Sequence, residues 1–201
     1  MLPKQLHDLQ KFFQKFPGIG PRQASRFSFF LMKQNHSEID KLINALENLK
    51  KDVSVCNECY MPTAKNANCT ICTDTKRDKS ALCIVEKESD AINMEDAGIY
   101  KGRYLVLGET ISPIGESKTA KERLKKFTSQ LKNDDDKKEV VLALNNTKEG
   151  NFTSMYIKKL FDENLEEGKV KITRLGRGLS TGSELEYADD ETLKNAFESR
   201  K

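Results

Sequence analysis

Four cysteines in two closely spaced pairs constrain this chain more than any other feature of its sequence. Each pair has the spacing Cys-x-x-Cys: Cys56 and Cys59 form the first pair, and Cys69 and Cys72 the second, with nine residues between the pairs. Two such turns can direct four thiolates at one tetrahedral metal ion, so the spacing predicts a zinc knuckle. Because four thiolates leave no open position for a water or a substrate, we expect one structural zinc per chain.

A redox dithiol or a pair of disulfides is the main alternative to zinc. A thioredoxin-like dithiol is normally a single Cys-x-x-Cys at the start of a helix, whereas this chain has two such pairs with polar residues between them. The chain opens Met1-Leu2-Pro3-Lys4-Gln5 without the apolar run of a signal peptide, so we expect a reducing cytoplasm, where disulfides are rare. The fifth cysteine, Cys83, lies in an apolar segment and is predicted to be a buried core residue.

The positive charge of the chain is concentrated near its amino-terminal end. The net charge is only +3, but residues 1–55 contain nine Lys or Arg against five Asp or Glu, while residues 79–201 contain 22 against 23. A locally basic segment favours a polyanionic partner, although a solvated lysine-rich face is a plain alternative. No stretch approaches the roughly 20 apolar residues of a membrane span, so we expect no membrane association.

Apolar residues at helical spacing predict three helices in residues 1–53. The first stripe runs from Leu6 to Phe16, the second helix covers 22–33, and the third begins with a capped start at Ser37. The first helix is expected to stop at Pro17, where the segment Pro-Gly-Ile-Gly-Pro forms a tight turn. This order of elements is the helix-hairpin-helix pattern.

The turn has the residues needed to hold a DNA phosphate. Gly18 and Gly20 allow a sharp bend with exposed amides, and the next helix presents the positive end of its dipole. Arg22 and Arg26, one helical turn apart, add direct charge, and Lys15 on the preceding helix is a weaker candidate. Such contacts bind the DNA phosphate backbone and do not distinguish one base sequence from another. The plain alternative is a glycine turn that only joins two helices.

Residues 79–173 alternate short apolar runs with segments of helical length. Strands are predicted at 81–85, 103–107, 139–144 and 170–175, and helices at 90–97, 118–131 and 152–165. This alternation predicts the α/β class, with a mainly parallel sheet covered by helices. The charged segment 133–138 is expected to be a loop without chemistry.

Glu86 follows the first predicted strand, at the end of an open sheet where functional groups usually lie. A metal-dependent nucleotidyl enzyme would need paired aspartates at a second strand end, because Mg²⁺ prefers hard oxygen ligands. Asn145 and Thr147 occupy those positions, so we discount a two-metal mechanism. For Glu86, Asp90 and Glu149 we favour a solvated sheet edge or an interface over catalysis.

Residues 174–201 are expected to form a loop and a helix at a subunit contact. The stretch 174–183 contains three glycines, but its spacing is not that of a phosphate-binding loop, and a flexible binding loop is expected. An acidic segment follows, and then a terminal helix through Leu193 and Phe197.

In this order, the motifs resemble those of the RecR family of bacterial recombination mediators along essentially the whole chain. The resemblance is carried by Phe16-Pro17-Gly18-Ile19-Gly20-Pro21-Arg22, the four paired cysteines, Cys83-Ile84-Val85-Glu86, Tyr104-Leu105-Val106-Leu107-Gly108, Ile111-Ser112-Pro113, Gly178-Leu179 and Leu185-Glu186-Tyr187-Ala188-Asp189. It implies a helix-hairpin-helix head at 1–53, a four-cysteine zinc-finger motif at 54–78, a Toprim-like domain at 79–173 and a C-terminal segment at 174–201. Arg22 and Arg26 correspond to the family's hairpin arginines, and Glu86 to its Toprim acidic residue.

What the resemblance implies is a DNA-binding scaffold without catalytic turnover. In this family four subunits can enclose DNA as a ring, and the protein works with RecO and RecF at single-stranded gaps to help replace single-strand binding protein with RecA. A partner-binding role for the Toprim face, including Glu86 and Glu149, is also implied. The alternatives are a Toprim-type enzyme that cuts or joins nucleic acid, and a small DNA-binding module that forms no ring.

The chain departs from the family pattern at two places. After Gly115 it lacks the further Gly-Pro that is usual in the family, so the family pattern does not predict the conformation of that loop. Asn151 follows Gly150 where an acidic residue is usual, which weakens any metal site at this edge.

Overall fold

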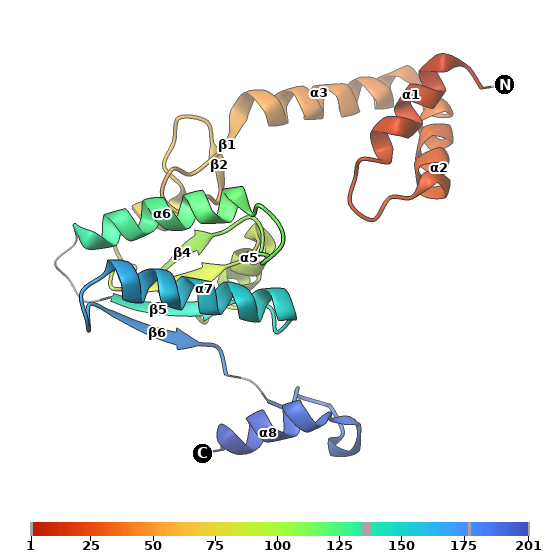
Figure 1. Ribbon diagram of the computed structural model, residues 1–201. Helices are drawn as coiled ribbons and strands as arrows, with labels where there is room; N and C mark the ends of the chain where they lie inside the picture. Colours follow the sequence, from red (N-terminus) through yellow and green to blue (C-terminus); the bar gives the residue numbers. More distant parts are fainter. Residues whose placement is uncertain (1, 134–137, 177, 201) are drawn as a thin grey trace. The chain divides into compact units, whose positions relative to one another are not determined.

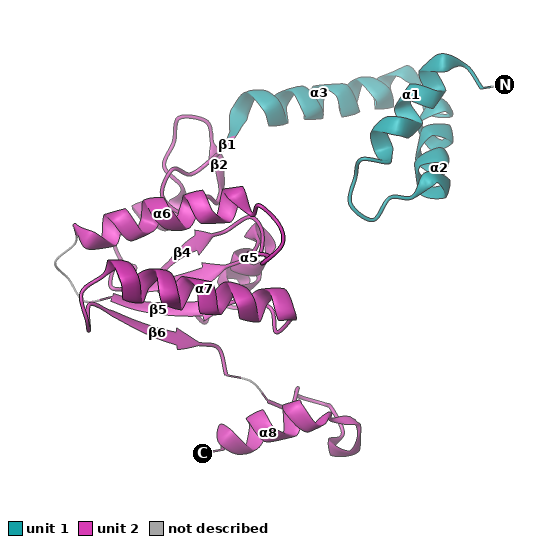
Figure 2. Cartoon of the chain, in the orientation of Figure 1, with its two compact units in different colours: residues 1–53 teal, residues 54–201 magenta. Residues whose placement is uncertain are grey.

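The computed structural model describes residues 2–133, 138–176 and 178–200. The chain divides into two compact units, Met1–Val53 and Ser54–Lys201 (Figures 1 and 2). Most of the charged segment predicted as a loop at 133–138, and Arg177 of the glycine-containing loop, lie outside the described residues. None of the described helices is long and apolar enough to cross a membrane.

Unit 1 consists of three helices: α1 (Lys4–Phe13), α2 (Pro21–Met32) and α3 (His36–Asp52). Helix α1 ends earlier than predicted because the amides of Lys15 and Phe16 bond to carbonyls three residues back and tighten the chain. Phe13 nevertheless contacts the rings of Phe16 and Phe27 edge to face, at 5.8 Å in each case, and so joins α1 to the turn and to α2.

The start of α3 differs slightly from the sequence prediction. Asn35, rather than Ser37, caps the helix: its Oδ1 accepts the amide of Glu38 at 2.9 Å. Both residue types are good caps, so the pattern alone did not distinguish them.

Unit 2 contains a four-stranded sheet formed by β3 (Ala81–Val85), β4 (Arg103–Val106), β5 (Lys138–Ala143) and β6 (Val170–Arg174). The strand order is β4-β3-β5-β6 and every pairing is parallel; Cys83 lies opposite Tyr104 and Val141. The predicted parallel sheet covered by helices is therefore confirmed.

The two faces of the sheet are covered differently (Figure 1). On one face, Leu82 and Ile84 pack with residues of α6 (Lys118–Lys132) and α7 (Lys148–Asn164). On the other face, Cys83 and Val85 pack with α5 (Glu88–Asp96) and with the segment that carries the paired cysteines. Cys83 is fully buried, as its apolar neighbours predicted.

Several short elements were not anticipated from the sequence. The cysteine segment contains a two-stranded sheet, β1 (Val53–Val55) with β2 (Pro62–Ala64), and a single helical turn, α4 (Thr70–Thr73). The carboxyl-terminal part contains the 3-10 turn η1 (Leu185–Tyr187), which precedes the expected terminal helix α8 (Asp190–Glu198). Helix α7 begins four residues earlier than predicted because Thr147 caps it, accepting the amide of Gly150 at 3.1 Å.

Candidate metal centre and nucleic-acid interface

The structure brings the four predicted metal ligands together. The Sγ atoms of Cys56, Cys59, Cys69 and Cys72 lie within 4.8 Å of one another, with 3.3 Å between Cys59 and Cys69 and 3.9 Å between Cys56 and Cys72. A tetrahedral zinc about 2.3 Å from each sulfur places neighbouring sulfurs about 3.8 Å apart. All five cysteines of the chain are free thiols. The cluster therefore fits a zinc ion.

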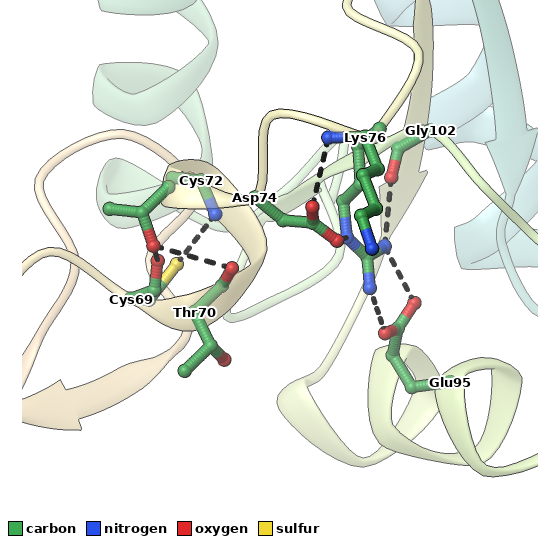
Figure 3. Close-up of polar contacts among 9 residues, drawn as sticks. Cys69, Thr70, Cys72, Asp74, Lys76, Glu95 and Gly102 are labelled. Atoms are coloured by element: carbon green, nitrogen blue, oxygen red, sulfur yellow. Dashed lines mark hydrogen bonds and ion pairs between the residues drawn. The ribbon is translucent and has the colours of Figure 1, made fainter.

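Local backbone geometry positions each pair of ligands. Cys56 lies just after β1, where its amide bonds to the carbonyl of Met61 and its own carbonyl accepts the amide of Tyr60, which closes the first turn. Cys69 caps α4: its sulfur accepts the amide of Cys72 at 3.3 Å (Figure 3). Both pairs thus face one another from two tight turns.

The thiols differ in how readily they ionise. Burial opposes ionisation of Cys56, but hydrogen bonds from the backbone of Cys59, Glu58 and Cys69 outweigh it and lower its pKa to about 6. Burial raises the pKa of Cys69 to about 11, and the pKa of Cys72 is also raised, first by its contact with Cys59 and then by burial. Four adjacent thiolates repel one another, so a divalent cation is what allows all of them to ionise.

The cysteine segment is attached to the edge of the sheet by polar contacts that the sequence did not predict. The carbonyl of Cys59 accepts the amide of Val106 at 3.0 Å. The Arg123 guanidinium lies over the ring of Tyr60, 4.3 Å from its centroid, and donates to the carbonyl of Val106 at 2.9 Å. Lys126 donates to the carbonyl of Asn57 at 2.9 Å. Helix α6 therefore supports the metal-binding turn.

The glycine turn of unit 1 leaves the start of α2 open. Gly18 has φ +76°, which favours glycine, and Gly20 is the N-cap residue, so no side chain caps α2 among the described residues. Arg22 and Arg26 are exposed and form no ion pair with any described residue. Lys15 is also exposed, with its ammonium 6.0 Å from the ring of Phe12. The helix dipole and two arginines are thus available to an anion.

The carboxyl edge of the sheet has no obvious set of metal ligands among the described residues. Glu86 is half-buried, accepts from the side-chain amide nitrogen of Asn145 at 2.9 Å and lies 3.4 Å from the ammonium of Lys87. Glu149 is exposed in the first turn of α7. Asn151 accepts from the Arg174 guanidinium at 2.7 Å. Within the described part of the chain, the four paired cysteines form the only group of three or more potential metal ligands.

Serine hydroxyls close the loop that lacks the family's further Gly-Pro. Ser112 Oγ accepts the amides of Ile114 and Gly115, both at 3.2 Å, and Ser117 Oγ accepts the amide of Ser112 at 2.9 Å. The loop is anchored to α7 because Thr153 Oγ1 accepts the amide of Ile111 at 2.8 Å. The hydrogen bonds of these serine hydroxyls therefore define the conformation of the loop, although the Gly-Pro that is usual in the family is absent from the sequence.

Comparison with known proteins covers almost the whole chain. The recombination protein RecR of Dehalococcoides mccartyi is 40% identical over 186 residues, which make up 92% of this chain and 88% of that protein. The chain belongs to the RecR family. The RecR proteins of Lactobacillus acidophilus and Mycoplasmopsis pulmonis are each 38% identical over at least 92% of both chains.

Two RecR domain models and a Toprim domain model match in the order that the motifs suggested. The RecR helix-hairpin-helix model matches residues 6–50, a Toprim domain model matches 80–176, and the RecR C-terminal model matches 178–201. The resemblance seen in the sequence motifs is therefore confirmed, and the cysteine cluster lies between the first two matches.

Proposed function

We propose that this RecR-family protein is a DNA-binding recombination mediator in recombinational DNA repair, and that it acts by binding and assembly without catalytic turnover. The proposal is supported by relatives that are named recombination proteins. The observation that carries it is the uncapped start of α2, with Gly18 and Gly20 before it and Arg22 and Arg26 exposed beside it. Backbone amides and arginines arranged in this way bind phosphates of any base sequence.

In this proposal the protein acts with RecO and RecF at single-stranded gaps and helps to load RecA. Glu86 and Glu149 then contribute to a partner-binding face at the carboxyl edge of the sheet. Asn145 and Asn151 are neutral, and Asn145 already donates to Glu86, so this edge is better suited to polar contacts than to binding Mg²⁺.

One zinc ion per chain, held by Cys56, Cys59, Cys69 and Cys72, would be structural. When bound, the ion neutralises part of the thiolate charge and fixes the two turns. The chain's own contacts, from Cys59 to Val106 and from Arg123 to Tyr60, would transmit this rigidity to β4 and α6.

We further propose a homo-oligomer. The ring tetramer is what the family resemblance implies, and an exposed apolar groove on unit 1 supports a subunit contact. The groove has a volume of about 530 Å³ and is lined almost entirely by apolar side chains of all three helices, among them Leu6, Leu9, Leu31, Leu42 and Leu46. Helix α3 has no buried residue, and Leu46 and Leu49 are more than half exposed. An exposed apolar surface of this kind is typical of a subunit contact.

The experiment that tests the function incubates the zinc-loaded protein with single-stranded, duplex and gapped DNA in the presence of Mg²⁺ or Mn²⁺. Binding and covalent change of the DNA are read in the same samples. We expect binding with intact DNA, and increased RecA loading on gapped DNA when RecO and RecF are added. Cut or joined DNA that disappears with Glu86→Ala would instead identify a Toprim-type enzyme.

A further inference from the structure

Helix α6 carries a concentration of positive charge that the proposed hairpin contact does not use. The helix contains six basic residues and one acidic residue, Glu122, in 15 positions. Residues 79–201 as a whole are close to neutral, so this charge is segregated on one element. Arg123 and Lys126 serve the fold through Tyr60, Val106 and Asn57. The other four basic residues need a separate explanation.

These four residues, Lys118, Lys121, Lys125 and Lys132, form one stripe along α6. At 100° per residue they lie within about 60° of one another around the helix, and at 1.5 Å per residue they extend over about 21 Å. The helix buries Ala120, Leu124 and Leu131 in the core, on a different face. We call the stripe the α6 lysine surface; it flanks the buried face of α6, and Lys118, Lys125 and Lys132 are exposed while Lys121 is half-buried.

The charges of the α6 lysine surface are not neutralised within the described residues. None of the four lysines forms an ion pair there, and Lys132 has only a 3.4 Å contact with the amide oxygen of Asn164. Lys118 stands at the first position of α6, where the helix dipole is also positive and no acidic residue occupies the first turn. Lys169 donates to the carbonyl of Lys132 and adds a cation at the other end.

Two adjoining hollows extend this positive surface. One, of about 480 Å³, is lined by two lysines and one acidic residue, Lys125, Lys126 and Glu122, and by the polar Gln130, Ser129 and Asn133. Gln130 also lines the second, of about 290 Å³, together with Arg103 and Lys79. The Nε of Arg103 is buried and has no hydrogen-bond partner among the described residues, while its Nη1 lies 3.7 Å from Glu58. The hollows therefore offer donors to an anionic group.

We propose that the α6 lysine surface binds the phosphate backbone of nucleic acid, as a contact separate from the glycine turn of unit 1. Lysines clustered along one side of a helix are the electrostatic signature of nucleic-acid binding. A protein partner is less suited, because protein interfaces are depleted in lysine and enriched in aromatic anchors, whereas the large apolar residues of α6 are buried or half-buried. The stripe is about 21 Å long, which is enough to contact several phosphates of a DNA backbone.

The proposal rests on the proposed function only in taking DNA as the ligand. Its test uses the full-length, zinc-loaded protein with Lys118, Lys121 and Lys125 all replaced by Gln. The matched control replaces Lys158, Lys171 and Lys194 by Gln, three exposed lysines that form no ion pair within the described residues and lie outside α6. Both variants lose three positive charges, so the comparison separates a local contact from a general loss of charge.

Affinity for labelled single-stranded and duplex DNA is measured over a range of salt concentrations. We expect the α6 variant to bind about tenfold more weakly at low salt, and the slope of log K against log salt to fall by about two to three units for duplex DNA. The control should remain within about twofold of the unmodified protein. Glu122→Gln, which removes the only acidic group on α6, should increase affinity.

A second readout maps the contact directly. DNA should protect Lys118, Lys121 and Lys125 from an amine-acetylating reagent, as read by mass spectrometry, and should leave Lys158 reactive. The proposal is overturned if the unmodified protein binds DNA but the α6 variant has the same DNA affinity as the control. It is also overturned if the three α6 lysines remain reactive in the presence of DNA. Either result is expected if the α6 lysine surface binds an acidic protein instead. If the unmodified protein binds no DNA, the proposed function fails first.

Discussion

Arg77 holds the carboxylate of Glu95 at two points. Its Nη1 donates to Oε1 at 2.9 Å, its Nη2 contacts Oε2, and Nη1 also donates to the carbonyl of Gly102 at 3.0 Å. Arg77 follows the paired cysteines in the chain, and Glu95 lies on α5. The contact therefore attaches the cysteine segment to the helix that covers the Cys83 and Val85 face of the sheet. Two parallel charge-assisted bonds define the relative position of the two elements.

Replacing Glu95 by Gln should destabilise the protein by about 2 kcal/mol at pH 7, because a charged hydrogen-bonded partner is lost. Hydrogen bonding to Arg77 lowers the pKa of Glu95 below its ordinary value of 4.5. The stabilisation from this pair is therefore complete above about pH 4.5 and is lost as the pH falls through the lowered pKa. Urea unfolding at several pH values should show the difference between the two proteins shrinking below about pH 4.5; a constant difference would contradict the assignment.

Cys69→Ser should lose the metal and destabilise unit 2. Cys69 is one of four ligands and also caps α4, but serine is itself a good cap, so this replacement removes the metal-binding free energy and can keep the cap. We expect a loss of zinc stoichiometry and a fall in unfolding free energy of several kcal/mol. Cys83→Ala is the control, since Cys83 is a buried cysteine of β3 outside the group of four, and the variant should retain one zinc. A Cys69→Ser protein that keeps its zinc would exclude the four-cysteine site.

The double substitution Arg22→Ala and Arg26→Ala should weaken DNA binding without unfolding the chain. Both side chains are exposed, so the melting temperature should change little. The slope of log K against log salt should fall by about two units for duplex DNA. Lys50→Gln with Lys51→Gln removes the same charge from exposed positions of α3 and is the matched control. Equal affinities for the two variants would remove the turn from the mechanism.

Gly150→Ala should destabilise the sheet edge even though alanine is the better helix former. A Cβ at position 150 would lie 2.0 Å from the carbonyl oxygen of Asn145, so α7 or the segment after β5 must move. We expect a loss of about 1–3 kcal/mol by denaturant unfolding. Gly176→Ala, where a Cβ meets no atom within 4 Å, should be nearly neutral. Similar stability for both variants would show that the backbone at Gly150 does not lie too close to the Asn145 carbonyl to accept a Cβ.

Leu46→Glu should reduce the oligomeric mass in light scattering, because it places a charge in the apolar groove of unit 1. Asn48→Glu adds the same charge two residues away, at an exposed position that does not line the groove, and should leave the mass unchanged. A Leu46→Glu protein with unchanged mass would show that the groove is not a subunit contact.

The parts of the fold that could be predicted are those that the sequence encodes locally. The bounds of β3 follow from its apolar run, the start of α6 from the segment of helical length between two such runs, and the four grouped cysteines from their spacing. The predicted ends of helices were less accurate, because single hydrogen bonds decide where a helix begins and ends. The hydroxyl of Thr147 lengthens α7 at its start, and the tighter turns after Phe13 shorten α1.

The contacts between distant residues could not be predicted. Glu86 and Asn145 are 59 residues apart and meet only because β3 and β5 are neighbours in the sheet. Alternating strands and helices indicate a parallel sheet, but they do not give the order of its strands. The contact of Arg123 with Tyr60 likewise depends on where the cysteine segment lies against α6, which no local pattern records.

Gly20 stands where most helices have a Ser, Thr, Asp or Asn, so the first amides of α2 remain available to an outside acceptor. In the proposed function that acceptor is a phosphate, a group that every nucleotide of the genome repeats without variation. A phosphate contact of this kind can slide from one nucleotide to the next, and it does not select a particular DNA sequence. The place where such a protein works is then decided by whatever recruits it, and its own contribution is to stay attached once it arrives.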